Sequence, residues 1–127
     1  MECKVFDSCH IAGKKWAVPI IEDIALERFN GFNNFISRSG GITPKTLSRY
    51  MKHLEAAGIV KKNILYHRNR KIVSYILTEK GAEFHNILGQ IKRWNIKWNK
   101  VPEFCVNMVC SECQKTDTKE HEIRRIR

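Results

Sequence analysis

The hydrophobic period of this chain changes abruptly near Gly58, and the change limits the folds that the chain can adopt. Before Gly58, apolar residues recur every three or four positions, as on one side of an α-helix, with Leu47, Met51 and Leu54 on the stripe. Thr43 followed by proline is a typical helix start, and glycine is a typical helix end. The sequence therefore predicts a helix that begins just after Thr43 and ends just before Gly58.

Beyond Gly58 the spacing becomes alternating. Residues 59–66 and 72–77 are rich in Ile, Val and Tyr, and each alternates with the period of a β-strand. The polar and basic residues 67–71 between them predict the tip of a hairpin. A helix followed directly by a two-stranded hairpin is therefore the expected centre of the fold.

Helical periodicity also occurs on both sides of this centre. Residues 4–12, 16–28 and 29–37 each predict a helix, and residues 39–41 predict a tight turn. A last helix is expected over residues 78–101, and the following proline would end it. Its apolar stripe consists of Phe84, Ile87, Leu88, Ile91, Trp94 and Trp98. The stripe is longer than so small a core requires, so part of it is expected to face a partner.

Length and composition indicate one small soluble domain. The chain has 127 residues, of which 43% are hydrophobic, as is ordinary for a globular protein. No apolar run is long enough to cross a membrane and no apolar segment lies near the start, so we expect neither a transmembrane helix nor a signal peptide, and a cytoplasmic protein. Residues 1–101 are expected to form the domain, and residues 102–127 a basic, weakly ordered tail that carries cysteines.

Positive charge is concentrated in the middle of the chain. The formal net charge is +10, and most of it lies between Ile42 and Ile72, where basic residues greatly outnumber the single acid, Glu55. These basic residues are Lys45, Arg49, Lys52, Lys61, Lys62, Arg68, Arg70 and Lys71. A scattered surplus would be only a solvated face, whereas this concentration favours an anionic polymer as the partner.

The order of these elements is that of a winged helix-turn-helix. A helix with a basic face opposite its buried stripe, preceded by another helix and a glycine turn, is typical of a helix-turn-helix. The second helix of such a motif enters the major groove, and a basic hairpin after it would be a wing. The predicted DNA contacts are Thr43, Lys45, Thr46, Ser48, Arg49 and Lys52 on the helix and Arg68, Arg70 and Lys71 on the hairpin.

Several motifs of the chain resemble the HxlR-type winged helix-turn-helix regulators. The motifs are Cys3, Gly13-Lys14-Lys15-Trp16, Arg28-Phe29-Asn30, Ile42-Thr43, Leu47-Ser48, Leu54-Glu55-Ala56-Ala57-Gly58-Ile59-Val60 and Tyr75-Ile76-Leu77-Thr78-Glu79-Lys80-Gly81. The spacing from Cys3 to the Gly-x-Lys-Trp segment is the most specific of them. The chain departs from the family at Lys4, where a proline is usual, and in its hairpin, which lacks the usual proline.

The resemblance implies a mainly α (α+β) fold, with a two-stranded β-hairpin wing and terminal helices for dimerisation. It implies a homodimer that binds double-stranded DNA. We therefore expect a sequence-specific transcription regulator that binds a palindromic operator through the helix at 43–57 and the wing at 61–75. The alternative is a sequence-tolerant nucleic-acid-binding protein, associated with chromatin or RNA, that uses only the charge.

Catalysis is not expected. The sequence contains no Gly-rich phosphate loop, no paired-carboxylate motif and no recognisable Ser-His-Asp arrangement, and its histidines lack metalloprotease spacing. The sequence therefore predicts a binding protein and not an enzyme.

The five cysteines are expected to be reduced thiols, because the chain carries no export signal. Cys3 matches, by its spacing, a family position that senses oxidants or electrophiles in some members, and the charge of Lys4 would favour the reactive thiolate. The alternative for Cys3 is a semi-buried packing residue. Cys105, Cys110 and Cys113 resemble a zinc or iron–sulfur ligand set, but they could equally form a disulfide or be unassigned thiols. No other cofactor is expected.

Overall fold

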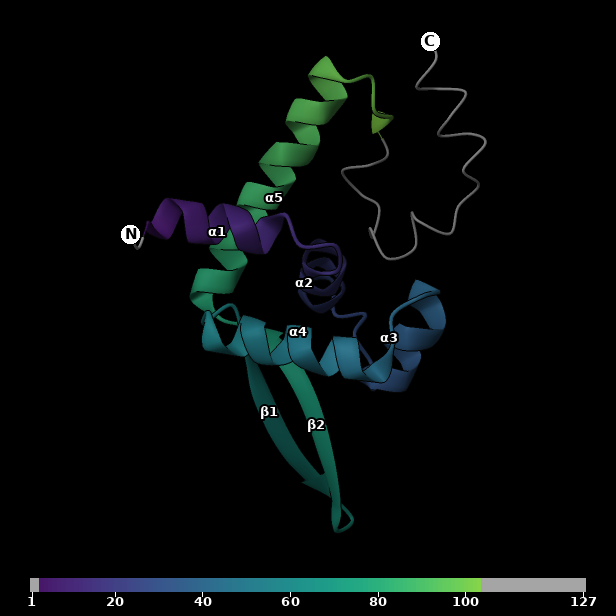
Figure 1. Ribbon diagram of the computed structural model, residues 1–127. Coiled ribbons are helices and arrows are strands. Elements are labelled where there is room, and N and C mark those ends of the chain that lie inside the picture. Colours follow the sequence, from purple (N-terminus) through teal and green to yellow (C-terminus); the bar gives the residue numbers. More distant parts are fainter. Residues whose placement is uncertain (1–2, 104–127) are drawn as a thin grey trace.

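The computed structural model describes residues 3–103, which form five α-helices and one two-stranded antiparallel sheet. In chain order these are α1 (Lys4–Ala12), α2 (Ala17–Ala25), α3 (Gly31–Ser39), α4 (Pro44–Ala56), β1 (Val60–His67), β2 (Arg70–Leu77) and α5 (Glu79–Trp98). Figure 1 shows β1 and β2 extending away from the helices as a narrow ribbon. The architecture is a winged helix-turn-helix, which confirms the predicted fold class.

The core forms around α2, which is apolar on nearly all sides. Ile20 and Ile21 are fully buried, and α2 contacts α1, α5 and β2. Burial of one such side chain contributes about 1.5–3 kcal/mol to folding. The buried cluster consists of Trp16, Ile20, Ile21, Ile24, Phe35, Ile42, Leu47, Met51, Leu54, Ile59, Val60 and Leu88. It joins α2, α3, α4, the base of the wing and α5 into one body.

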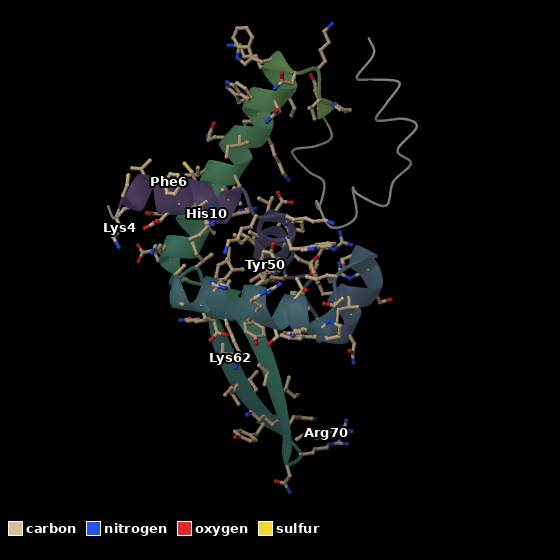
Figure 2. The ribbon with its side chains drawn as sticks, in the orientation of Figure 1. Lys4, Phe6, His10, Tyr50, Lys62 and Arg70 are labelled. Carbon is tan, nitrogen blue, oxygen red and sulfur yellow. The ribbon has the colours of Figure 1, made fainter. Side chains whose placement is uncertain are left out.

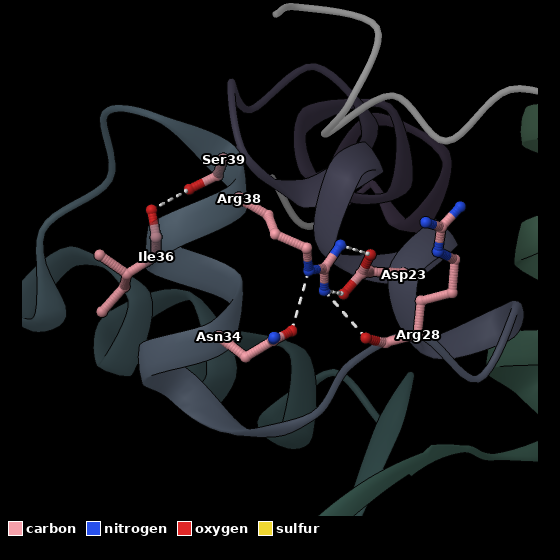
Figure 3. Close-up of polar contacts among 6 residues, drawn as sticks. All are labelled: Asp23, Arg28, Asn34, Ile36, Arg38 and Ser39. Atoms are coloured by element: carbon pink, nitrogen blue, oxygen red, sulfur yellow. Dashed lines mark hydrogen bonds and ion pairs between the residues drawn. The ribbon is translucent and has the colours of Figure 1, made fainter.

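Two acidic residues of α2 are also buried, and both have basic partners. Arg38 of α3 donates to both carboxylate oxygens of Asp23, with Nη1–Oδ1 at 3.0 Å and Nη2–Oδ2 at 2.6 Å. The same guanidinium donates to the carbonyl of Arg28 at 2.9 Å (Figure 3). Glu22 pairs with Lys92 of α5. These ion pairs connect α2 to α3 and α5. Both contacts matter for stability, because a buried carboxylate without a partner is strongly destabilising.

The boundary between α2 and α3 differs from the prediction. α2 ends at Ala25, three residues earlier than expected, because Glu27 adopts a left-handed conformation with φ 57°. α3 begins at Gly31 and ends where Gly40 has φ 71°, a conformation that glycine adopts without strain. Phe29 therefore lies before α3 instead of starting it, although its ring still packs on the core.

α4 has the start, stripe and end that the sequence predicts. The Thr43 hydroxyl accepts a hydrogen bond from the N–H of Thr46 at 3.2 Å, and proline occupies the first helical position. The three residues of the predicted apolar stripe are at most 2% exposed. Gly58 follows the helix with φ 75°. The opposite side of α4 is therefore left for solvent or a partner.

The wing is longer and its turn tighter than predicted. The register begins with Val60 opposite Leu77 and continues to the turn without a bulge. Arg68 and Asn69 form the turn, with φ values of 51° and 61°. Two residues with positive φ match the twist of an antiparallel ribbon, so the strands extend into the segment 67–71 that was predicted to be a loop.

An aromatic cluster holds the base of the wing. The ring of Tyr75 lies 5.8 Å from that of Phe29, edge to face, and 6.2 Å from that of Phe32. Phe29 also lies 5.5 Å from Phe35, which is fully buried. Burial, and secondly the charge of Glu55, raise the pKa of the Tyr75 phenol above its usual value. The wing is thus attached to the core near its base, while most of its length is exposed.

α5 begins at a capped N-terminus and ends earlier than predicted. The Thr78 hydroxyl accepts from the N–H of Gly81 at 3.0 Å. At the other end the helix stops at Trp98, and Lys100 has φ 55°, so Pro102 does not end it as expected. The domain boundary at residue 101 stays a prediction, since most of the predicted tail lies outside the described residues.

Candidate nucleic-acid interface

The outward face of α4 carries a shallow groove with a basic lining, which we call the α4 groove. Its lining residues are Lys45, Ser48, Arg49, Lys52, His53 and Ala56. Lys45, Arg49 and Lys52 are exposed, and Ser48 is half-buried. Four of the six DNA contacts predicted on this helix therefore lie on one surface, where positive side chains surround a hollow.

The other two predicted helix residues, Thr43 and Thr46, hold the start of α4. The Thr43 hydroxyl donates to the Thr46 hydroxyl oxygen at 2.9 Å and accepts from the Thr46 N–H. Neither residue lines the α4 groove. A helix N-terminus presents N–H groups and the positive end of the helix dipole, which bind phosphate. This arrangement suits contact with a DNA backbone better than contact with a base edge.

The predicted wing contacts lie on a second basic surface. Arg68, Arg70 and Lys71 are exposed at or beside the turn, and Figure 2 shows Arg70 near the tip and Lys62 closer to the helices. A strand of eight residues spans about 26 Å. The structure therefore does not bring the wing residues together with the α4 groove. A ligand that met both surfaces would have to be long.

Sequence reasoning missed Lys14, although this residue lies close to α4. Lys14, in the turn between α1 and α2, lines a second hollow together with Arg49, Tyr50 and His53. No local pattern links Lys14 to α4, because the two are far apart in the sequence. Its only signal was its place in the Gly13–Trp16 motif.

Cys3 lies at the N-terminus of α1. It is exposed in the single chain, and its sulfur accepts from the N–H of Phe6 at 3.5 Å. Both the redox role and the alternative packing role of Cys3 stay predictions. Cys9, also on α1, is exposed as well. A helix N-terminus and Lys4 both place positive charge near this sulfur.

Neither the predicted metal ligands nor a membrane span is found in the described part of the chain. Cys105, Cys110 and Cys113 lie outside the described residues. Within residues 3–103, no group of three His, Cys, Asp or Glu side chains is placed to hold a metal ion. Over the same residues, no helix has the length and hydropathy needed to cross a membrane.

Two helices expose apolar side chains that the core does not use. α1 has no buried residue, and its Val5 and Phe6 are 73% and 69% exposed. On α5, Leu88 of the predicted stripe is buried, whereas Trp94 and Trp98 are 58% and 64% exposed. The remaining exposed apolar residues of α5 are Ile87 and Ile91. The prediction that the apolar stripe of α5 is longer than the core requires is therefore confirmed.

Comparison with known proteins assigns the chain to a family. Residues 11–103 match the model of the HxlR-like helix-turn-helix. The chain belongs to the HxlR-like helix-turn-helix family. The match extends from the end of α1 past α5, so it includes α4, the wing and the turn that carries Lys14.

Two relatives of this chain are named as transcriptional regulators. The chain is 36% identical over 87 residues to the HTH-type transcriptional regulator BH0655 of Halalkalibacterium halodurans, covering 68% of this chain and 76% of that protein. It is 30% identical over 88 residues to the HTH-type transcriptional regulator YvaP of Bacillus subtilis, covering 69% and 80%.

Solved structures share the same fold. The redox regulator HypR in its oxidised form aligns with a TM-score of 0.62 at 29% identity, over 75% of this chain and 96% of HypR. Diamide-treated YodB from B. subtilis aligns with a TM-score of 0.61 at 26% identity, over 77% of this chain and 96% of YodB.

Proposed function

We propose that this protein is a cytoplasmic, non-enzymatic transcription regulator that binds double-stranded DNA sequence-specifically. The observation that carries the proposal is the α4 groove, whose basic residues lie on the outward face of the second helix of a helix-turn-helix. Such a helix enters the major groove with its exposed side chains toward base edges. The basic wing would contact the backbone beside it, and the names of the relatives support this role.

The competing function is sequence-tolerant binding of nucleic acid by charge alone. Both functions predict binding that weakens with salt, so affinity for one DNA cannot separate them. The test is to compare the affinity for DNA upstream of the protein's own gene with that for random duplex of equal length, at one salt concentration. A regulator should prefer its operator by roughly 10³-fold or more. Equal affinities for upstream segments and random duplex would favour the competing function.

We further propose that the protein acts as a homodimer on a palindromic operator. Isolated helices as short as α1 are unstable in water, and α1 packs on the core only through the partly buried Ile11 and Ala12 at its C-terminal end. Exposed Trp94 and Trp98 on α5 supply the large apolar side chains that a stable interface needs. A two-fold dimer would place its two α4 helices about 34 Å apart, one turn of duplex.

Sedimentation of the purified protein tests the dimer. A variant with Trp94→Glu and Trp98→Glu is expected to sediment as a monomer, because it places charge in the apolar surface. The control, Asn86→Glu with Arg93→Glu, adds the same acids at exposed α5 positions outside the apolar stripe and should remain a dimer. If wild type is a monomer, or both variants dimerise equally well, this interface is wrong.

Cys3 is proposed as an oxidant sensor. Its thiol is exposed at the N-terminus of α1, so a change in its chemistry would act on a helix assigned to the dimer interface. HypR is a redox regulator, which supports the same role here. Mild diamide should lower operator affinity in wild type and leave Cys3→Ser unaffected. A Cys3→Ser variant that still responds would place the sensor at another cysteine, and replacing the three tail cysteines by Ser would show whether it lies in the tail or at Cys9.

We propose separately that Cys105, Cys110 and Cys113 bind a metal. The proposed DNA binding by α4 and the wing does not need a cofactor. Three thiolates at this spacing suit zinc or an iron–sulfur cluster. Elemental analysis of protein purified without chelator should find about one metal centre per chain if they hold one. Loss of that metal in a Cys110→Ser variant, with operator binding retained, would fit a site in the tail that is independent of α4.

A further inference from the structure

The hollow beside the α4 groove, lined by Lys14, Arg49, Tyr50 and His53, is built from two separate segments. We call it the Lys14 hollow. Lys14 comes from the turn before α2, and the other three residues come from α4. Arg49 and His53 line both the Lys14 hollow and the α4 groove. The two depressions therefore adjoin, and the side chains of the second are two cations, an imidazole and a phenol.

The turn that carries Lys14 is held in a defined position. The Lys14 N–H donates to the carbonyl of Ile11, and its carbonyl accepts from the N–H of Ala17, both at 3.2 Å. The N–H of Trp16 donates to the Tyr50 hydroxyl at 3.4 Å, and Trp16 is only 7% exposed. The turn is thus fixed to α4 through Tyr50. A ligand in the hollow would meet a backbone that is already ordered.

We propose that the Lys14 hollow binds a phosphate oxyanion of the DNA backbone, next to the bases that meet the α4 groove. The inference rests on the proposed function, because it takes the same duplex as its ligand. An ammonium, a guanidinium and a hydroxyl all donate hydrogen bonds, and a phosphate oxygen accepts several at once. Tyr50 keeps its own hydrogen to donate while it accepts from Trp16.

The position of the hollow favours a phosphate of the duplex over a free anion. A helix in the major groove has a sugar-phosphate backbone along each of its flanks, and half to two-thirds of protein–DNA hydrogen bonds go to that backbone. Arg49 borders the base-facing groove and the hollow, so one duplex would reach both. Lys14 would then raise affinity for any DNA sequence, without choosing between sequences.

The test compares Lys14→Ala with the matched control Lys15→Ala. Lys15 is the exposed neighbour, with its Nζ 5.2 Å from the Trp16 ring centroid, so the control removes the same charge from the same turn. Affinities for operator and for random duplex are measured between 50 and 200 mM salt, in chloride and in inorganic phosphate of equal ionic strength. Log affinity falls as log salt rises, and each phosphate contact makes this slope steeper by about 0.9. The advantage of wild type over Lys14→Ala should therefore shrink about threefold across this range, on both DNAs.

The outcomes separate this inference from the proposed function. The contact between Lys14 and a DNA phosphate is supported if the salt dependence of Lys14→Ala is less steep on both duplexes while that of Lys15→Ala stays close to wild type. Equal slopes for the two variants overturn it. A third outcome is that inorganic phosphate weakens DNA binding by wild type but not by Lys14→Ala, while the slopes in chloride are equal. This outcome would assign the hollow to a free oxyanion and would also overturn the DNA phosphate contact. If wild type shows no preference for operator, the regulator proposal fails, while the slopes on random duplex still decide the Lys14 contact.

Discussion

Replacing Gly81 by alanine should destabilise the protein, although the same change normally strengthens a helix. A Cβ atom at Gly81 would lie 2.0 Å from the carbonyl oxygen of Ile59 and 2.9 Å from its carbonyl carbon. Both are backbone atoms, so rotation of a side chain cannot relieve the steric clash. That carbonyl also accepts the N–H of Thr78 at 3.0 Å, which fixes it at the start of α5.

The expected magnitude follows from three opposing effects. Overpacking costs about 1–3 kcal/mol, and disturbing the Thr78 cap costs about 0.5–2 kcal/mol. Alanine returns about 1 kcal/mol of helix propensity. Gly81→Ala should therefore lower the free energy of unfolding by about 0.5–4 kcal/mol, compared with the 5–15 kcal/mol that is typical of a domain.

Gly89 in the same helix is the matched control. A Cβ atom there would meet only the end of the Arg93 side chain, at 3.8 Å. Gly89→Ala should therefore stabilise the protein by about 0.5–1 kcal/mol. Urea unfolding followed by circular dichroism gives both values, at one protein concentration because dimerisation would shift the apparent stability. If Gly81→Ala is as stable as Gly89→Ala, the close approach of α5 to Ile59 is wrong.

Other substitutions test the groove, the wing and the core. Arg49→Ala should weaken operator binding by about 1–3 kcal/mol and random duplex by less, and an equal loss on both would assign Arg49 to phosphate alone. Replacing Arg68 and Arg70 by alanine should flatten the plot of log affinity against log salt by roughly 1–2 units per protomer, and an unchanged slope would place the wing away from DNA. Asp23→Ala leaves a guanidinium without its carboxylate partner and should cost about 3 kcal/mol in urea unfolding; a loss below 1 kcal/mol would contradict it. Because the folded protein raises the pKa of Tyr75, the neutral phenol favours the folded state. This contribution to stability is complete at pH values below the ordinary pKa of 10.0. That contribution is lost as pH rises through the raised folded-state pKa, so wild type should lose more stability above pH 10 than Tyr75→Phe, as thermal unfolding across pH will show.

Short-range features of the chain were predictable because their causes lie within a few residues. The stripe of α4, its Thr43 cap and its stop at Gly58 depend on neighbours three or four positions apart, and all three are confirmed. The concentration of positive charge and the family motifs are likewise readable without a structure. Errors arose where a backbone conformation outweighed the pattern, as at Glu27, which ends α2, and at Arg68, which tightens the wing.

The sequence by itself determined the class of fold, the concentration of positive charge and the helix whose outward face carries part of it, because periodicity, capping and charge are local properties. Tertiary structure alone decided which distant residues share a surface. Lys14 reaches the side of Arg49 only because buried Trp16 and Tyr50 fix the turn to α4. The pairing of Asp23 with Arg38 likewise depends on α3 packing across α2. Such contacts follow from the packing of the whole core, so no window of neighbouring residues contains them.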